Sequence, residues 1–212
     1  MTANEKEIRM FSGALESRKD EERQKTTIEG TPIVFEQKTD LGMWDEVIDR
    51  GALDKTDLRD VRLLINHDTS QLPLARSRNN NANSTMQLTV EEDGLHIRAD
   101  LDVENNPRAA EVLSAVERQD VTGMSFMFTV DKDSWENLDS DHPVRHIRSI
   151  GKVFEASVVT FPAYEQTSVY ARSLESVKSE LESEREALES ARKTEELRKA
   201  LSERSMNLCR KD

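Results

Sequence analysis

The C-terminal segment constrains the fold most, because it cannot form a hydrophobic core of its own. Residues 172–212 contain no Gly, Pro or aromatic residue and consist mainly of Glu, Lys, Arg, Ser, Ala and Leu. Their apolar residues form one narrow helical stripe, interrupted by a change of phase: Leu174, Val177, Leu181 and Leu188, then Leu197, Leu201 and Leu208. This pattern predicts a solvated helix or weak coiled coil, or a segment that binds a partner or is removed. We therefore expect a folded domain over residues 1–171 and a charged helical tail over residues 172–212.

Length and charge narrow the function classes. The chain is long enough for one domain with a hydrophobic core. Its 42 acidic and 30 basic residues give a formal charge of −12, which repels nucleic acid and anionic membranes. The single cysteine, Cys209, forms neither an internal disulfide nor a CxxC metal pair, which favours a reducing compartment. Residues 1–20 lack the apolar run of a secretory signal, so we expect a cytoplasmic protein that binds no nucleic acid and no membrane.

Short β-branched and aromatic runs between turn signals predict mainly β structure over residues 5–170. The expected strands are 7–11, 27–35, 61–66, 86–90, 95–101, 121–130 and 152–160, the last ended by Phe161-Pro162. The pair Asp93-Gly94 predicts a hairpin between two of these strands. One helix is expected over residues 107–118, with Asn106 as its N-cap. Residues 76–85, rich in Asn and Ser, predict a mobile loop.

Two residues could act as a nucleophile and its base. His67 follows the apolar run LLIN, so it lies at the end of a buried strand as a general base or as a structural residue. In TGMSFMFTV, alternation places Ser125 on the face opposite the bulky Met124, Phe126 and Phe128. A serine attacks a carbonyl only if a base takes its proton. A catalytic Ser125 therefore requires His67 within hydrogen-bonding reach, and without it Ser125 is an ordinary strand residue.

Glu155 is a carboxylate inside the apolar strand KVFEASVV, so it should be either paired or functional. It could orient a histidine base and stabilise the imidazolium as the third member of a triad. Alternatively, regular alternation would place it with Val153, Ser157 and Val159 on a face open to solvent.

A metal site is a further alternative. His142 and His146 are four residues apart, the spacing of two ligands on one helix face. Pro143 and the β-like pattern after it disfavour a helix, and no HExxH motif occurs. A metal-dependent hydrolase would use His67, His142 and His146, and a chelator would inhibit it. We expect no cofactor.

Six segments in order resemble the prohead proteases of tailed bacteriophages, a serine peptidase family related in fold to the herpesvirus assemblins. They are IEGTPIVF, MWDEVIDRGALDKT, LLINHD, the DG hairpin with LHIRADL, the helix leading into TGMSFMF, and FEASVVTFPAYEQT. The family usually has a β-branched residue after the glutamate, where this chain has Ala156. The resemblance implies an α+β, mainly β fold: a herpesvirus-protease-like small β-barrel flanked by helices, with the C-terminal charged helical extension.

The resemblance also implies residue roles and partners. The histidine of the NHD segment is the base and the serine of the GMS segment is the nucleophile, which assigns these roles to His67 and Ser125. Glu155 matches the strand that supplies an acidic third member, whereas the assemblins use a second histidine, which leaves His142 and His146 open. The implied activity is a serine endopeptidase of capsid maturation. It would cleave the scaffolding segment of the major capsid protein, any scaffold protein and itself, inside the assembling prohead in the host cytoplasm, and it could form a homo-oligomer.

A non-enzymatic role is the remaining alternative. The chain would then be a catalytically inactive capsid-assembly or scaffolding factor whose tail is the functional part. The charged fraction of 34% and the long tail favour this class. The presence of all three triad candidates argues against it, because a decayed protease would have lost at least one.

Overall fold

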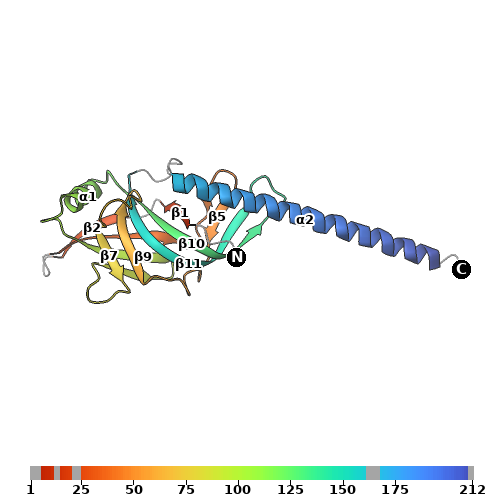
Figure 1. Cartoon of the computed structure of the whole chain (residues 1–212), viewed down its shortest axis with the longest axis horizontal. Coiled ribbons are helices and arrows are strands. Elements are labelled where there is room, and N and C mark those ends of the chain that lie inside the picture. Colours follow the sequence, from red (N-terminus) through yellow and green to blue (C-terminus); the bar gives the residue numbers. More distant parts are fainter. Residues whose placement is uncertain (1–5, 12–14, 21–24, 161–167, 210–212) are drawn as a thin grey trace.

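Eleven strands and two helices make up the part of the chain that the computed structural model describes, residues 6–11, 15–20, 25–160 and 168–209 (Figure 1). The predicted mixed class, α+β with mainly strands, is confirmed. The elements are β1 (Lys6–Phe11), β2 (Leu15–Asp20), β3 (Lys25–Val34), β4 (Thr39–Asp40), β5 (Asp45–Ile48), β6 (Asp60–Ile65), β7 (Ala75–Arg78), β8 (Met86–Val90), β9 (Gly94–Leu101), α1 (Pro107–Glu117), β10 (Gly123–Glu136), β11 (Val144–Val159) and α2 (Ser168–Cys209).

The long strand β11 organises the larger sheet. Along one edge it pairs antiparallel with β10, whose other edge carries β1. Along its opposite edge it pairs parallel with two strands in succession, β5 at its start and β6 near its end. The strands β4 and β7 extend this seven-stranded sheet beyond β5 and β6. Because β6 ends beside the last residues of β11, the loop after β6 lies next to the end of β11.

The smaller sheet has four antiparallel strands in the order β2-β3-β9-β8. Its β8–β9 pair is the hairpin that Asp93-Gly94 predicts, since Val90 pairs with Leu95. One continuous core takes side chains from both sheets and α1, including Ile28, Leu63 and Phe126, each fully buried. Burying this apolar surface is the main stabilisation of the fold.

The predicted closed barrel is not confirmed. Strand pairing among the described residues gives two separate sheets, and neither sheet closes on itself. The sequence patterns missed β2, β4, β5 and β7, three of which have only two or four residues. Residues 75–78 form β7, so the expected loop over residues 76–85 begins later than predicted. The expected strand end at Phe161-Pro162 lies outside the described residues.

The helix α1 begins and ends within a residue of its predicted bounds. Asn106 is its N-cap: the side chain accepts a hydrogen bond from the backbone N–H of Arg108, and Pro107 occupies the first turn. The buried residues Ala109, Val112 and Val116 recur at helical spacing and face the core. Local signals therefore suffice to define this helix.

The helix α2 has 42 residues and differs from the expected solvated tail in its first turns. Val177 and Leu181 are each only 2% exposed and pack with Trp44. The described side chains from Glu189 to Ser202 are all exposed, and Figure 1 shows this part of the helix extending well beyond the sheets. The expectation of a solvated helix is thus not met at Val177 and Leu181. No helix among the described residues is both long and apolar enough to cross a membrane.

Candidate active site

His67 lies just after β6 in an unusual backbone conformation. Both Asn66 (φ 49°) and His67 (φ 58°) are in the left-handed region, which a residue other than glycine rarely adopts. The Asn66 side chain bonds Thr160, with Nδ2 donating to Oγ1 at 3.0 Å and Oδ1 accepting from the backbone N–H at 2.9 Å. These bonds tie the residue before His67 to the end of β11.

Glu155 on β11 is the carboxylate that contacts His67. Nδ1 of His67 lies 2.5 Å from Oε1 of Glu155, and the two side chains are 7% and 4% exposed. Because a carboxylate only accepts, this contact places a proton on Nδ1. In the neutral imidazole Nε2 is then an acceptor, and it is buried without a hydrogen-bonding partner among the described residues. A buried, oriented imidazole with a free Nε2 is the arrangement that a general base requires.

A β-bulge in β11 brings Glu155 to the His67 side of the sheet. Met127 pairs with Glu155, yet the next residue of β10, Phe128, pairs with Val153, so Phe154 is an extra residue. The prediction that Val153 shares a face with Glu155 is therefore wrong: Val153 lies in the main core. The bulge shifts the alternation by one residue and separates the two side chains.

Ser157, two residues beyond Glu155, is fully buried and links the two site residues. Its hydroxyl donates to Oε2 of Glu155 at 2.6 Å. Oγ of Ser157 also accepts a hydrogen bond from the backbone N–H of His67 at 3.1 Å. Ser157 thus contacts the carboxylate and the backbone of the residue that the carboxylate orients.

Ser125 lies on β10 directly opposite Ser157 in the antiparallel pair. Directly paired side chains share a face of the sheet, with Cβ atoms about 5 Å apart. Ser125 is fully buried, and its hydroxyl donates to the backbone carbonyl of Arg9 on β1 at 2.8 Å. The structure therefore places Ser125 on the site face, one strand away from the Glu155 strand, without a hydrogen bond from its hydroxyl to Nε2 of His67.

A pocket of about 310 Å³ opens beside Glu155. Most of the exposed lining surface is apolar. The pocket is lined by the apolar residues Leu64, Pro73, Met127 and Phe154, the polar residues Thr69 and Gln71, the carboxylate Glu155 and the cations Lys6 and Arg62. Thr69, Gln71 and Pro73 belong to the loop between β6 and β7, which also contains His67. A pocket lined by Glu155, the hydrogen-bonding partner of His67, is where a substrate side chain could be held.

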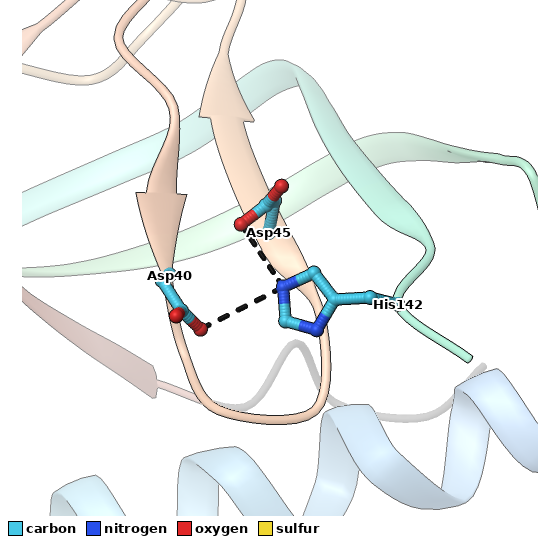
Figure 2. Close-up of side chains that lie close together, drawn as sticks. All are labelled: Asp40, Asp45 and His142. Atoms are coloured by element: carbon cyan, nitrogen blue, oxygen red, sulfur yellow. Dashed lines mark hydrogen bonds and ion pairs between the residues drawn. The ribbon is translucent and has the colours of Figure 1, made fainter. Parts of the chain in front are cut away.

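The other histidines contact different carboxylates. Figure 2 shows His142 between Asp40 and Asp45. Nε2 of His142 lies 3.1 Å from Asp45 and 3.6 Å from Asp40, and Nδ1 of His146 lies 2.8 Å from Asp49. Within the described ranges, the groups of side chains close enough to share a metal ion include neither His67 nor His146. The alternative metal site of three histidines is thus not formed.

The cluster in Figure 2 is partnered without a metal. Lys38 Nζ lies 3.2 Å from Asp45, and Asp40 accepts from the backbone N–H of Gly42 at 2.7 Å. Burial acts to raise the pKa of Asp45, but hydrogen bonds from His142 and Lys38 outweigh it and hold this pKa below its usual value. These contacts describe a set of ion pairs at the β4–β5 hairpin.

Comparison with known proteins assigns the chain to a family. Residues 13–180 match the family described as caudovirus prohead serine protease, which is most of the chain. The chain belongs to this family. The predicted resemblance to prohead proteases is confirmed.

Two individual proteins are similar to parts of this chain. The prohead protease of Enterobacteria phage HK97 is 30% identical over 113 residues, which cover 53% of this chain and 45% of that protein. The match thus spans less than half the length of the HK97 protein. The solved structure of the bacteriophage T4 capsid assembly protease, gp21, aligns over 73% of this chain and 99% of that chain, with 13% identity and a TM-score of 0.40. That structural likeness is too weak to carry an argument.

Ser157 is the residue of the candidate site that the sequence patterns did not indicate. It is one of many serines in the chain, and nothing in its immediate sequence marks it as functional. The one available signal was its spacing, since Ser157 stands two residues after Glu155 and alternation places both on one face.

Proposed function

We propose that the chain is a serine endopeptidase of capsid maturation in which Ser125 is the nucleophile, His67 the base and Glu155 the orienting acid. The observation that carries the proposal is the His67–Glu155 hydrogen bond, with a free Nε2 on the sheet face that also holds Ser125. Membership of the prohead serine protease family gives this arrangement its reaction.

The chemistry is acyl transfer. Oγ of Ser125 attacks the carbonyl carbon of a peptide bond while Nε2 of His67 takes its proton, and the negative charge develops on the carbonyl oxygen. The carbon–nitrogen bond then breaks as Nε2 returns the proton to the leaving amine. Water, deprotonated in the same way, cleaves the acyl-enzyme and restores Ser125. Glu155 stabilises the imidazolium that forms in each step.

The attack requires the Ser125 hydroxyl to leave its bond to Arg9. The hydroxyl of Ser125 donates to the Arg9 carbonyl at 2.8 Å and would have to turn towards His67. Hydrogen bonds of catalytic groups are often formed only when substrate is bound. We therefore infer that the described arrangement is the state before substrate binding.

The proposed substrates are the scaffolding segment of the major capsid protein, a scaffold protein where one exists, and the chain itself, all inside the assembling prohead in the host cytoplasm. We assign catalysis to the sheets and targeting to the tail predicted over residues 172–212. Because Val177 and Leu181 pack on the body, the targeting portion is the exposed outer half of α2. Leu197 and Leu201 in this half are each 65% exposed and lie one helical turn apart, as a helix-binding surface requires.

One observation favours the inactive assembly factor as a second candidate. Ser125 is fully buried, and its hydroxyl is engaged with Arg9 rather than with His67. In that case the hydrogen bonds of His67 and Glu155 would be structural, and the tail alone would act on the capsid protein.

Co-expression with the capsid protein of the same phage distinguishes the two candidates. Intact masses are followed over time for the native chain, for Ser125→Ala and for Ser77→Ala, which removes an equally buried hydroxyl on β7. The native chain and Ser77→Ala should trim the capsid protein, and Ser125→Ala should not. If the native chain leaves all masses unchanged in assembled shells, the enzyme proposal fails and the assembly-factor candidate replaces it.

A further inference from the structure

We propose that Ser157 is a positioning residue of this active site, one that holds the general base in its reactive geometry. The inference rests on the proposed function for its kinetic consequence and on geometry alone for the rest. The Ser157 hydroxyl makes two contacts at once, to the backbone N–H of His67 and to Oε2 of Glu155. It therefore holds both the backbone of His67 and the carboxylate of Glu155, the two groups that orient the imidazole ring.

The hydrogen-bonding capacity of the hydroxyl makes this arrangement directional. Ser157 has one O–H, which it donates to Oε2, and its lone pairs remain to accept from His67 N–H. With Oε2 engaged, Oε1 is the Glu155 oxygen that accepts from Nδ1. Nδ1 thereby keeps the proton and Nε2 keeps the free lone pair that a base needs. A hydroxyl at residue 157 thus favours the reactive tautomer and ring orientation of His67.

The backbone at His67 needs such support. A left-handed conformation at a non-glycine residue is strained and persists only where the surroundings enforce it. The side chain of Asn66 is bonded to Thr160, but these bonds hold the residue before His67. The contact from Ser157 acts on His67 itself, since it satisfies the backbone N–H at the strained residue.

Ser77 provides a matched comparison. It is also fully buried, and its hydroxyl also joins a side chain to a backbone N–H, donating to Oδ1 of Asn80 at 3.1 Å and accepting from Asn80 N–H at 3.3 Å. It lies on β7 and contacts neither His67 nor Glu155 through these bonds. Substituting either serine by alanine should lower the stability by a similar amount, because both hydroxyls are equally buried and make two hydrogen bonds. Only Ser157→Ala should affect the base.

The experiment compares the native chain, Ser157→Ala and Ser77→Ala by proton NMR and by the rate of capsid-protein trimming. The Nδ1 proton of His67, in a short bond to a carboxylate, should give a far-downfield resonance, which Glu155→Gln assigns by abolishing it. We expect Ser157→Ala to lose or markedly broaden this resonance and to trim roughly 10- to 100-fold more slowly, the effect of a misplaced catalytic group. Ser77→Ala should keep both the resonance and the rate.

The outcomes separate this proposal from the proposed function. If Ser157→Ala keeps the resonance and trims within about twofold of the native rate, the positioning role is refuted. If the native chain trims nothing, the proposed function fails, while the resonance still decides whether Ser157 orients His67. Should Ser157→Ala not fold, hydrogen exchange of the native chain decides: a protected His67 amide supports the bond to Ser157, and free exchange refutes it.

Discussion

A cluster of buried charged side chains that α2 contacts shows how the pKa of a carboxyl group depends on the opposite charges beside it. Arg9 donates to Glu7 at 2.5 Å and to Glu46 at 2.8 Å, and Arg145 donates to Glu7 at 2.8 Å. Burial opposes ionisation of Glu7, but the two arginines outweigh it and hold the pKa of its carboxyl below its usual value. Glu180 on α2 differs: burial, then the charge of Asp133, raises its pKa, and Arg145 at 3.7 Å does not compensate.

Two substitutions should therefore act in opposite directions at pH 7. Glu7→Gln removes one partner of buried arginines and should cost about 3–5 kcal/mol of unfolding free energy. The pKa of Glu7 is lower in the folded state than in the unfolded state. Its stabilisation is therefore present at pH values above the unfolded-state pKa and is lost as the pH falls through the folded-state pKa.

The pKa of Glu180 is instead raised in the folded state. Its contribution to stability is therefore full at pH values below the unfolded-state pKa and is lost as the pH rises through the folded-state pKa. Glu180→Gln should thus melt at or above the native temperature at pH 7.

Melting temperatures of both variants and the native chain, measured from pH 4 to pH 7, check these expectations. The advantage of Glu180→Gln should disappear at the acidic end, where native Glu180 is itself neutral. A lower melting temperature for Glu180→Gln at pH 7 would show that its pair with Arg145 is stabilising after all.

At the scale of elements, β11 decides the site through its length and its bulge. Its 16 residues pair with β5 at one end and with β6 at the other, so one strand carries Glu155 and also places the end of β6 beside it. The extra residue Phe154 turns Glu155 onto the face of Ser125. The loop from β6 to β7 then carries both His67 and part of the pocket lining.

A substitution in this loop should impair substrate binding without impairing the catalytic residues. Thr69 is exposed and lines the pocket beside Glu155, so Thr69→Trp should fill the pocket without disturbing the core. We expect trimming of the capsid protein to slow by about tenfold or more, the usual effect of blocking a side-chain pocket, with hydrolysis of a small ester nearly unchanged. Leu72→Trp, on the same loop but 84% exposed and outside the pocket lining, is the control. Equal effects of the two variants would mean that the pocket does not hold substrate.

For the whole molecule, α2 joins two regions of different character. Its first half covers Trp44 with Val177 and Leu181, and Arg185 donates to the carbonyl of Leu138 at 3.0 Å. Beyond Glu189 the described side chains are exposed, and the helix extends away from the sheets (Figure 1). A deletion that tests targeting must therefore begin well after residue 172.

Two truncations should separate stability from targeting. Removing residues 194–212 should leave the urea midpoint and ester hydrolysis unchanged, but should abolish incorporation into proheads, as measured by mass spectrometry of purified shells. Removing residues 172–212 also exposes the Trp44 cluster, and the loss of Val177 and Leu181 alone should cost about 3–6 kcal/mol. Full incorporation of the chain that lacks residues 194–212 would refute the targeting role of the outer helix.

The sequence by itself determined the elements that local signals define. Short β-branched, aromatic and apolar runs located β3, β6, β8 and β9, the Asp93-Gly94 turn predicted the hairpin of β8 and β9, and Asn106 with Pro107 set the start of α1. Alternation also placed Ser125 opposite the bulky face of β10, whose Met124, Phe126 and Phe128 lie in the main core. These features depend on residues a few positions apart, so the pattern is visible in the chain.

Only the tertiary structure decided how these parts meet. Glu155 reaches His67 across 88 positions of sequence because β11 and β6 pair in parallel, and a single bulge residue determines which side of the sheet it faces. Strand pairing also gave two sheets in place of the expected barrel, and packing against Trp44 buried Val177 and Leu181 of α2. Each outcome depends on contacts between segments far apart in the chain. Such contacts follow from the packing of the whole molecule, and local periodicity does not predict them.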